Sequence, residues 1–233
     1  MDKKTFKEQV NSKIIELNDK QFYLLEELLS FTLEENQKFN LTGIKDENEF
    51  RKLMLFDSLI PLKYVDFAGK NVLDLGSGAG FPGLPLAICS NGNYTLLDST
   101  KKKVDHIVRF ANEHKLDNVT GISARAEDFA IKNKEKYDVV ISRAVASLNI
   151  LLELSIPLLK VGGYMYALKG DRADEEILEA KNALKKLGAV IEETKVDYLD
   201  GENDKRVLLI IKKISKTNNK YPRSYSEIKS KPL

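Results

Sequence analysis

A cluster of glycines that follows a short apolar run is the stretch of this sequence best suited to hold a ligand. Val72 to Leu75 has the length and apolarity of a buried parallel strand, and Gly76, Gly78 and Gly80 come directly after it. Glycines at a strand-to-helix turn let the backbone adopt positive φ and approach a ligand closely. Pro82 suits the first turn of the helix that follows, whose unpaired N–H groups add positive potential. The alternative is a tight turn that serves packing alone.

Two acids accompany this turn. Asp74 lies in the strand, and Asp98 ends the second predicted strand. A carboxylate at the second position can accept hydrogen bonds from the ribose hydroxyls of an adenosine ligand, or it can cap the helix that begins near Ser99 and Thr100. Phe81 stands where a dinucleotide fingerprint requires its third glycine, so that motif is excluded. The order of residues instead resembles the first motif of S-adenosylmethionine-dependent methyltransferases.

The ends of the third and fourth predicted strands supply further candidates. Ala126 and Glu127 follow the third strand, where methyltransferases bind the adenine amino group; a surface acid is the alternative. Arg143 ends the fourth strand, where enzymes that methylate exocyclic amines carry Asn/Asp-Pro-Pro-Tyr/Phe, and this sequence lacks that signature. An arginine there can bond guanine oxygen 6, a phosphate or the cofactor carboxylate. Nitrogen 7 of guanine has a free lone pair and needs no general base, but spacing alone leaves the substrate open.

The cysteine and the two histidines of the chain indicate no further catalytic or metal site. Cys89 is the only cysteine, which excludes a disulfide framework, and its position in the first helix after the glycine turn predicts a core residue. His106 and His114 lie on one predicted helix, and we expect neither to bind a metal or act as a base. The sequence therefore predicts no metal site.

Strands and helices alternate from Lys70 onward, and this alternation predicts a doubly wound α/β fold with about seven strands in a Rossmann-like sheet. The last two strands are expected to form an antiparallel edge, and Gly188 to end a helix. The strands are expected at 71–75, 93–97, 118–122, 137–141, 163–168, 189–197 and 206–213. The helices are expected near 82–90, 101–115, 147–159 and 174–187.

Helical periodicity precedes this body, at 3–17, 21–38 and 46–59, with Asp46 as an N-cap. We therefore expect three parts: a helical appendage over 1–65, a cofactor-binding domain over 66–213 and a basic tail over 214–233. The net charge of the chain is only +2, but the tail is rich in lysine and arginine. Such a tail can hold a phosphate backbone, or it can be solvated and partly disordered.

The composition is that of a soluble globular protein, with 42% hydrophobic and 31% charged residues among 233. No apolar run reaches the length of a membrane span and no signal-peptide pattern opens the chain, so we expect a cytoplasmic protein that does not bind membranes. We also expect it to be a monomer.

The segment from Val72 to Ile88 resembles the signature of the ribosomal RNA small-subunit methyltransferase G family, also called glucose-inhibited division protein B. Further resemblance lies in Phe39-Asn-Leu-Thr42, Leu97-Asp-Ser99, Ile141-Ser-Arg-Ala144, Ala167-Leu-Lys-Gly170 and Tyr221-Pro-Arg223. The resemblance implies methyl transfer from S-adenosylmethionine to nitrogen 7 of a guanosine in 16S rRNA of the small ribosomal subunit.

By matching position, the resemblance also implies site residues. The cofactor residues would be Asp74, Gly76, Gly78, Phe81, Asp98, Ser99, Thr100, Ala126, Glu127 and Arg143, with Arg143 also catalytic. Lys169 and Arg223 would contact RNA. The family often has a histidine where this chain has Met54. A methyltransferase for a small molecule or protein, and a non-catalytic nucleotide-binding module, are the alternative functions.

Overall fold

A computed structural model describes residues 1–201 and 203–233. Within these residues the chain divides into two compact units. The first unit comprises residues 1–69 and 77–123, and the second comprises residues 70–76 and 124–233. The glycine turn is therefore shared, because its first glycine belongs to the second unit and its remaining residues to the first.

Seven strands are hydrogen-bonded in the order β3-β2-β1-β4-β5-β7-β6. They confirm the predicted α/β sheet. The strands are β1 (Asn71–Leu75), β2 (Asn93–Asp98), β3 (Val119–Ser123), β4 (Tyr137–Arg143), β5 (Leu159–Lys169), β6 (Ala189–Asp200) and β7 (Asn203–Lys213). The last three are longer than periodicity predicted.

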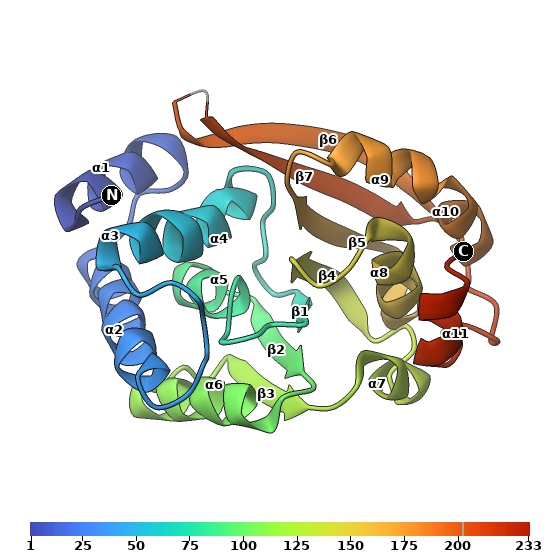
Figure 1. The fold of residues 1–233 in the computed structure, drawn as a ribbon, viewed down its shortest axis with the longest axis horizontal. Coiled ribbons are helices and arrows are strands. Elements are labelled where there is room, and N and C mark those ends of the chain that lie inside the picture. Colours follow the sequence, from blue (N-terminus) through green and yellow to red (C-terminus); the bar gives the residue numbers. More distant parts are fainter. Residues whose placement is uncertain (202) are drawn as a thin grey trace. The chain divides into compact units, whose positions relative to one another are not determined.

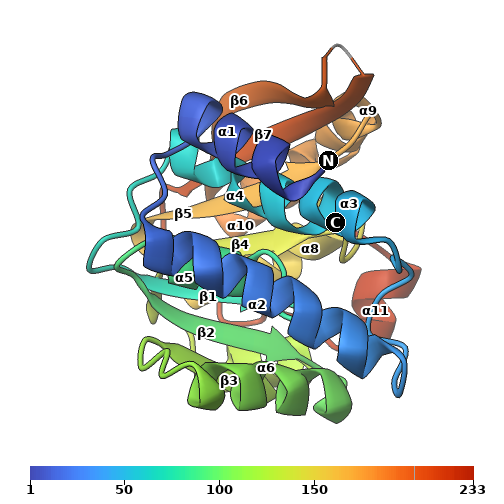
Figure 2. The same cartoon turned by 90° about the vertical axis from the view of Figure 1, so that its left-hand side faces the viewer.

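The helices of the first unit are α1 (Lys3–Lys13), α2 (Asp19–Asn36), α3 (Glu47–Phe50), α4 (Asp57–Leu59), α5 (Gly83–Cys89) and α6 (Lys101–Glu113). The apolar stripe of α2 is buried, as are Phe6 and Val10 of α1. The parallel pair β2 and β3 completes this unit. Figure 2 shows α2 and α6 running side by side, with the end of α2 next to the start of α6.

Two of the predicted N-terminal helices differ from expectation. Helix α1 ends at Lys13 instead of residue 17, because Asn18 already caps α2 through a capping box with Gln21. Asp46 caps α3 as predicted, by accepting the N–H of Glu49 at 2.9 Å. The backbone then changes to π-helical winding over Arg51–Phe56 before α4, and periodicity did not indicate this change.

The second unit holds β1, β4 and β5 in parallel, with β7 and β6 added antiparallel, so the predicted antiparallel edge is confirmed. Its helices are α7 (Ala126–Lys132), α8 (Leu148–Ser155), α9 (Ala173–Glu179), α10 (Lys181–Leu187) and α11 (Tyr225–Ser230). Figure 1 shows α9 and α10 beside the long β6–β7 pair, and α11 beside α8.

Several details of the second unit correct or confirm the sequence prediction. The helix expected at 147–159 ends at Ser155, where a 3₁₀ turn containing Pro157 follows. The helix expected at 174–187 is divided at Ala180. Gly188 ends α10 in the left-handed conformation, with φ 75° and ψ 44°, as predicted.

The basic tail is folded. Helix α11 begins with a capping box between Ser224 and Glu227, and the side chains of Tyr221 and Ile228 are buried. The partly disordered tail considered from composition is therefore wrong. No helix of the described residues has the length and apolarity needed to cross a membrane.

Candidate functional site

The glycine turn folds as its sequence predicts. Gly76 and Gly78 have φ values of 75° and 57°, which residues other than glycine rarely adopt. A Cβ on Gly76 would collide with the side chain of Val145, whereas a Cβ on Gly78 would meet nothing within 4 Å. Gly78 is therefore the glycine whose backbone borders open space, and Gly76 is a glycine because Val145 packs over it.

Asp98 is connected to the turn by hydrogen bonds. Its Oδ2 accepts the N–H of Gly78 at 3.0 Å, and its Oδ1 accepts the N–H of Thr100 at 2.8 Å. The second bond closes a turn onto Thr100, the N-cap residue of α6, and not onto an N–H of the first turn of the helix, so Asp98 does not itself cap α6. The ribose role of Asp98 stays a prediction. Its half-buried carboxylate is fixed by the backbone at the carboxyl end of β2, and each oxygen keeps a lone pair for another donor.

Ser77 adds a polar atom next to Gly78 in the first unit. Its side chain is 2% exposed, and within residues 1–201 and 203–233 its Oγ has no hydrogen-bond partner. Buried hydroxyls are normally paired. A buried unpaired hydroxyl, an open Gly78 and an oriented Asp98 carboxylate together fit a ligand that carries hydroxyl donors, such as the ribose of S-adenosylmethionine.

The remaining residues predicted on this unit have different environments. Phe81 is 4% exposed and packs edge-on against Phe50, with ring centroids 5.4 Å apart, so it is part of the interior. Ser99 and Thr100 are exposed. Met54 lies in the π-helical segment, where it is half-buried.

The second unit carries the other predicted cofactor residues. Asp74 is fully buried in β1. Ser142 Oγ donates to the carbonyl of Leu75 at 2.8 Å and so joins the ends of β4 and β1. Arg143 is the last residue of β4 and is half-buried, and Ala144 after it has a φ of 56°, a strained value for a residue other than glycine.

Ala126 and Glu127 open helix α7, which periodicity did not reveal. Both are half-buried. A local signal for this helix exists, since Glu127 and Asp128 lie in its first turn and Lys132 in its last, the arrangement that a helix dipole favours. The resemblance to methyltransferases identified these residues without identifying the helix.

The two predicted RNA contacts are both engaged in ion pairs. Lys169 Nζ donates to Glu176 at 2.7 Å and to the carbonyl of Ala146 at 2.8 Å, and its side chain is 8% exposed. Arg223 forms a two-pronged pair with Glu153, at 2.6 and 2.8 Å, and Glu153 is fully buried. This carboxylate raises the pKa of Arg223. Glu153 and Glu176 were missed because their partners lie in other elements.

Of the three side chains expected to be inert, His106 is buried, and Cys89 and His114 are half-buried. Burial raises the pKa of the Cys89 thiol to about 12, which keeps it protonated and a poor nucleophile. His106 is 2% exposed, stacks on Phe31 and lies 3.3 Å from Thr32 Oγ1 through its Nε2. Burial lowers the pKa of His106 to about 4. The described residues contain no group of histidine, cysteine and carboxylate side chains that could hold a metal ion.

An exposed basic and aromatic surface lies at the start of α6, in the first unit. The ring of Phe39 is 40% exposed, and Lys102 Nζ lies 5.1 Å from its centroid. Lys101 and Lys103 flank Lys102, directly after the Asp98 loop. Within the described part of the chain, none of these three lysines forms an ion pair.

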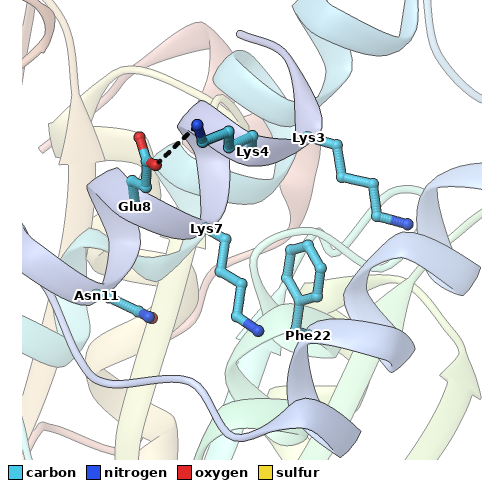
Figure 3. Close-up of a pocket in the computed structure, with 6 residues that line it drawn as sticks. All are labelled: Lys3, Lys4, Lys7, Glu8, Asn11 and Phe22. Carbon is cyan, nitrogen blue, oxygen red and sulfur yellow. Dashed lines mark ion pairs between the residues drawn. The ribbon is translucent and has the colours of Figure 1, made fainter.

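A surface hollow of about 450 Å³ lies between α1 and the start of α2. Figure 3 shows Lys3 and Lys7 beside the Phe22 ring, whereas Lys4 points toward Glu8. Each lysine is paired with a carboxylate: Lys3 with Glu26, Lys4 with Glu8 and Lys7 with Asp19. Because its charges are already balanced, this hollow is a weaker anion site than the start of α6.

Comparison with known proteins gives close relatives. The family described as rRNA small subunit methyltransferase G matches residues 21–205. The chain is 41% identical to the ribosomal RNA small subunit methyltransferase G of Lactobacillus johnsonii, over 240 residues that cover 100% of both. It is 40% identical to that of Lysinibacillus sphaericus, over 96% of this chain and 95% of the relative.

Solved structures share the fold at low identity. M. jannaschii TYW2 in complex with AdoMet aligns with a TM-score of 0.54 and 20% identity, over 65% of this chain and 72% of that one. A SAM dependent methyltransferase from Aquifex aeolicus aligns with a TM-score of 0.55 and 16% identity, over 76% and 97%. At such identities the likeness concerns the fold alone.

Proposed function

Because the chain belongs to the ribosomal RNA small-subunit methyltransferase G family, we propose that it transfers a methyl group from S-adenosylmethionine to nitrogen 7 of a guanosine in 16S rRNA. The observation that carries the proposal is the family match over residues 21–205, with relatives of the same name aligned from end to end. The local geometry around Gly78 and Asp98 supports the cofactor half of it.

Ser99 and Thr100, which are exposed beside Asp98, stay predicted cofactor contacts, and the other predicted cofactor residues have a definite task in this proposal. The Asp98 carboxylate accepts ribose hydroxyls, and the open face of Gly78 lets a ligand approach the backbone. Ala126 and Glu127 take the adenine edge. Asp74 and Gly76 support the turn from β1, and Phe81 supports it from the interior through Phe50. When bound, the cofactor supplies an activated methyl carbon on a sulfonium.

The proposed reaction needs no general base from the protein. Guanine nitrogen 7 carries no proton, so the protein needs to align the base and exclude water. Arg143, at the end of β4, donates hydrogen bonds to guanine oxygen 6 or to the cofactor carboxylate. The raised pKa of Cys89 and the lowered pKa of His106 agree with a reaction that uses neither a thiolate nor an imidazole base.

We place the RNA on the surface formed by Phe39 and Lys101–Lys103. An exposed ring offers a base a stacking partner, and unpaired ammonium groups neutralise phosphates. This surface adjoins Asp98 in the sequence and in the first unit. Arg223 and the exposed lysines of the tail remain predicted RNA contacts. Lys169 was predicted to be one as well, but its ammonium group is bonded to Glu176 and to the carbonyl of Ala146 inside the protein. The proposed enzyme is a monomer of the bacterial cytoplasm, where ribosomes are modified.

The test is methyl transfer from labelled S-adenosylmethionine to small ribosomal subunits from cells that lack this protein. After digestion to nucleosides, we expect the label in 7-methylguanosine. The matched control is the Arg143→Ala variant, which should bind small subunits and yield no labelled nucleoside. Label in another nucleoside would contradict the nitrogen-7 assignment. Cofactor binding without transfer to any ribosomal particle would favour a small-molecule or protein substrate, and binding of NAD in its place would favour a regulatory module.

A further inference from the structure

The side chain of Lys169 is enclosed at the end of β5. It is 8% exposed, and its Nζ donates to Glu176 Oε2 at 2.7 Å and to the carbonyl of Ala146 at 2.8 Å. An ammonium group with two of its three protons used inside the protein is poorly placed to neutralise a phosphate. The sequence suggested an RNA contact here, but the geometry points to a different task.

Glu176 makes a second bond with the same oxygen. Its Oε2 accepts the N–H of Leu148, the first residue of α8, at 2.7 Å. Ser147, the N-cap residue of α8, makes no cap bond with its side chain, because its hydroxyl donates to Asn149 instead. Glu176 of α9 therefore caps α8 from outside, and its negative charge suits the positive end of the helix.

The loop that precedes α8 has a strained backbone and packs on the glycine turn. Residues 144–147 connect β4 to α8. Ala144 has a φ of 56°, which costs a residue with a side chain on the order of 1 kcal/mol. Val145 is 39% exposed, and its side chain covers Gly76. Such a conformation persists only where the surrounding structure stabilises it. Lys169 binds the carbonyl of Ala146, and Glu176 binds the N–H of Leu148, so the two side chains fix the end of the loop next to α8.

We propose that Lys169 and Glu176 are positioning residues that fix the 144–147 loop, and through it Arg143 and the packing of Val145 on Gly76. The proposal rests on the proposed function, since Arg143 acts on substrate there. The pair is nearly buried, so removal of one partner leaves the other charge uncompensated and also frees the start of α8.

The test compares Glu176→Gln and Lys169→Met with Glu175→Gln, a control at an exposed neighbour that pairs with Arg172. Hydrogen exchange of residues 144–148 is measured in all three, together with kcat, KM for small subunits and its salt dependence. We expect faster exchange in the loop and a kcat lowered between about 10- and 100-fold for both variants, because misplaced groups lose that much rate. KM for subunits and its salt slope stay as in the wild type, and the control changes nothing.

Two results would overturn the inference. If Lys169→Met raises KM and flattens its salt slope while Glu176→Gln changes nothing, Lys169 is an RNA contact. If both variants only lower the melting temperature, with unchanged loop exchange and kcat in the folded protein, the pair is a structural bridge. The exchange measurement needs no substrate, so it decides whether the pair holds the loop even if the wild type methylates no ribosomal particle.

Discussion

Asp98 accepts a backbone N–H on each carboxylate oxygen, so both oxygens must act as acceptors. In the Asp98→Asn variant an amide NH₂ replaces one acceptor and faces a backbone N–H. We expect the affinity for S-adenosylhomocysteine to fall at least about tenfold, which corresponds to the loss of one charged hydrogen bond. Isothermal calorimetry measures it.

Asp105→Asn is the control for Asp98, because Asp105 is an exposed acid on the next helix. Its affinity for S-adenosylhomocysteine should match that of the wild type. Unchanged affinity in Asp98→Asn would remove Asp98 from the cofactor site and leave it a structural role, in its bonds to the backbone N–H groups of Gly78 and Thr100.

His106 makes stability depend on pH. Burial lowers its pKa from 6.5 to about 4, with Arg109 lowering it further and Glu35 opposing the shift. Between these values the unfolded chain binds a proton that the folded protein does not, so stability is full above pH 6.5 and falls as the pH drops towards 4. The loss approaches about 3 kcal/mol.

Urea unfolding of the wild type and of His106→Gln at pH 7 and pH 5 checks this dependence. The wild type should lose more stability between the two pH values than His106→Gln does. His114→Gln serves as the control and should behave as the wild type. An equal pH dependence in the wild type and His106→Gln would show that His106 titrates normally in the folded protein.

At the scale of elements, helix α6 begins with three lysines, the sign of charge that the positive end of a helix dipole disfavours. Lys101→Glu should therefore stabilise the fold by about 0.3–1 kcal/mol. The same variant should bind small ribosomal subunits more weakly, with the salt slope of binding reduced by about one. Opposite effects on stability and binding distinguish an RNA surface from an ordinary helix start.

Filter binding over a salt series and urea unfolding measure the two effects of Lys101→Glu. Lys181→Glu is the charge-matched control, at the exposed first residue of α10. It should leave RNA binding unchanged. If Lys101→Glu binds subunits as tightly as the wild type, the start of α6 does not contact RNA.

At the scale of the whole molecule, the C-terminal segment is part of the packed structure. Arg223 satisfies the buried charge of Glu153 on α8, and Tyr221 and Ile228 are buried. Truncation before Lys216 should therefore lower the free energy of unfolding by at least about 3 kcal/mol, because Glu153 remains buried without its partner. Urea unfolding measures this loss.

Truncation should destabilise the fold, so RNA binding by the tail is better tested with a variant that keeps the segment. In this variant the exposed lysines of the tail are replaced by glutamine, at Lys216, Lys220, Lys229 and Lys231. This variant should keep its stability and lose affinity for small subunits, with a flatter salt dependence. An unchanged salt slope would make the tail structural only. The domain boundaries at 65 and 213 stay a prediction, which limited proteolysis can test.

Short-range signals determined what the sequence predicted well. The apolar run at 72–75, the Asp46 cap and the glycine that ends α10 each depend on a few neighbouring residues. The glycine turn and Asp98 belong to this class too, because the turn needs φ values that its glycines alone permit. The family resemblance added the cofactor and the reaction, which no local signal specifies.

Tertiary structure decided the partners of the charged residues. The family resemblance implied that Lys169 and Arg223 contact RNA, and the fold places each beside a carboxylate from another element, Glu176 and Glu153. Periodicity also missed the π-helical winding at 51–56 and the short helices α7 and α11. The physical reason is common to these cases. Periodicity and caps act over one or two turns of chain, whereas an ion pair or a seven-residue helix depends on which distant surface packs against it.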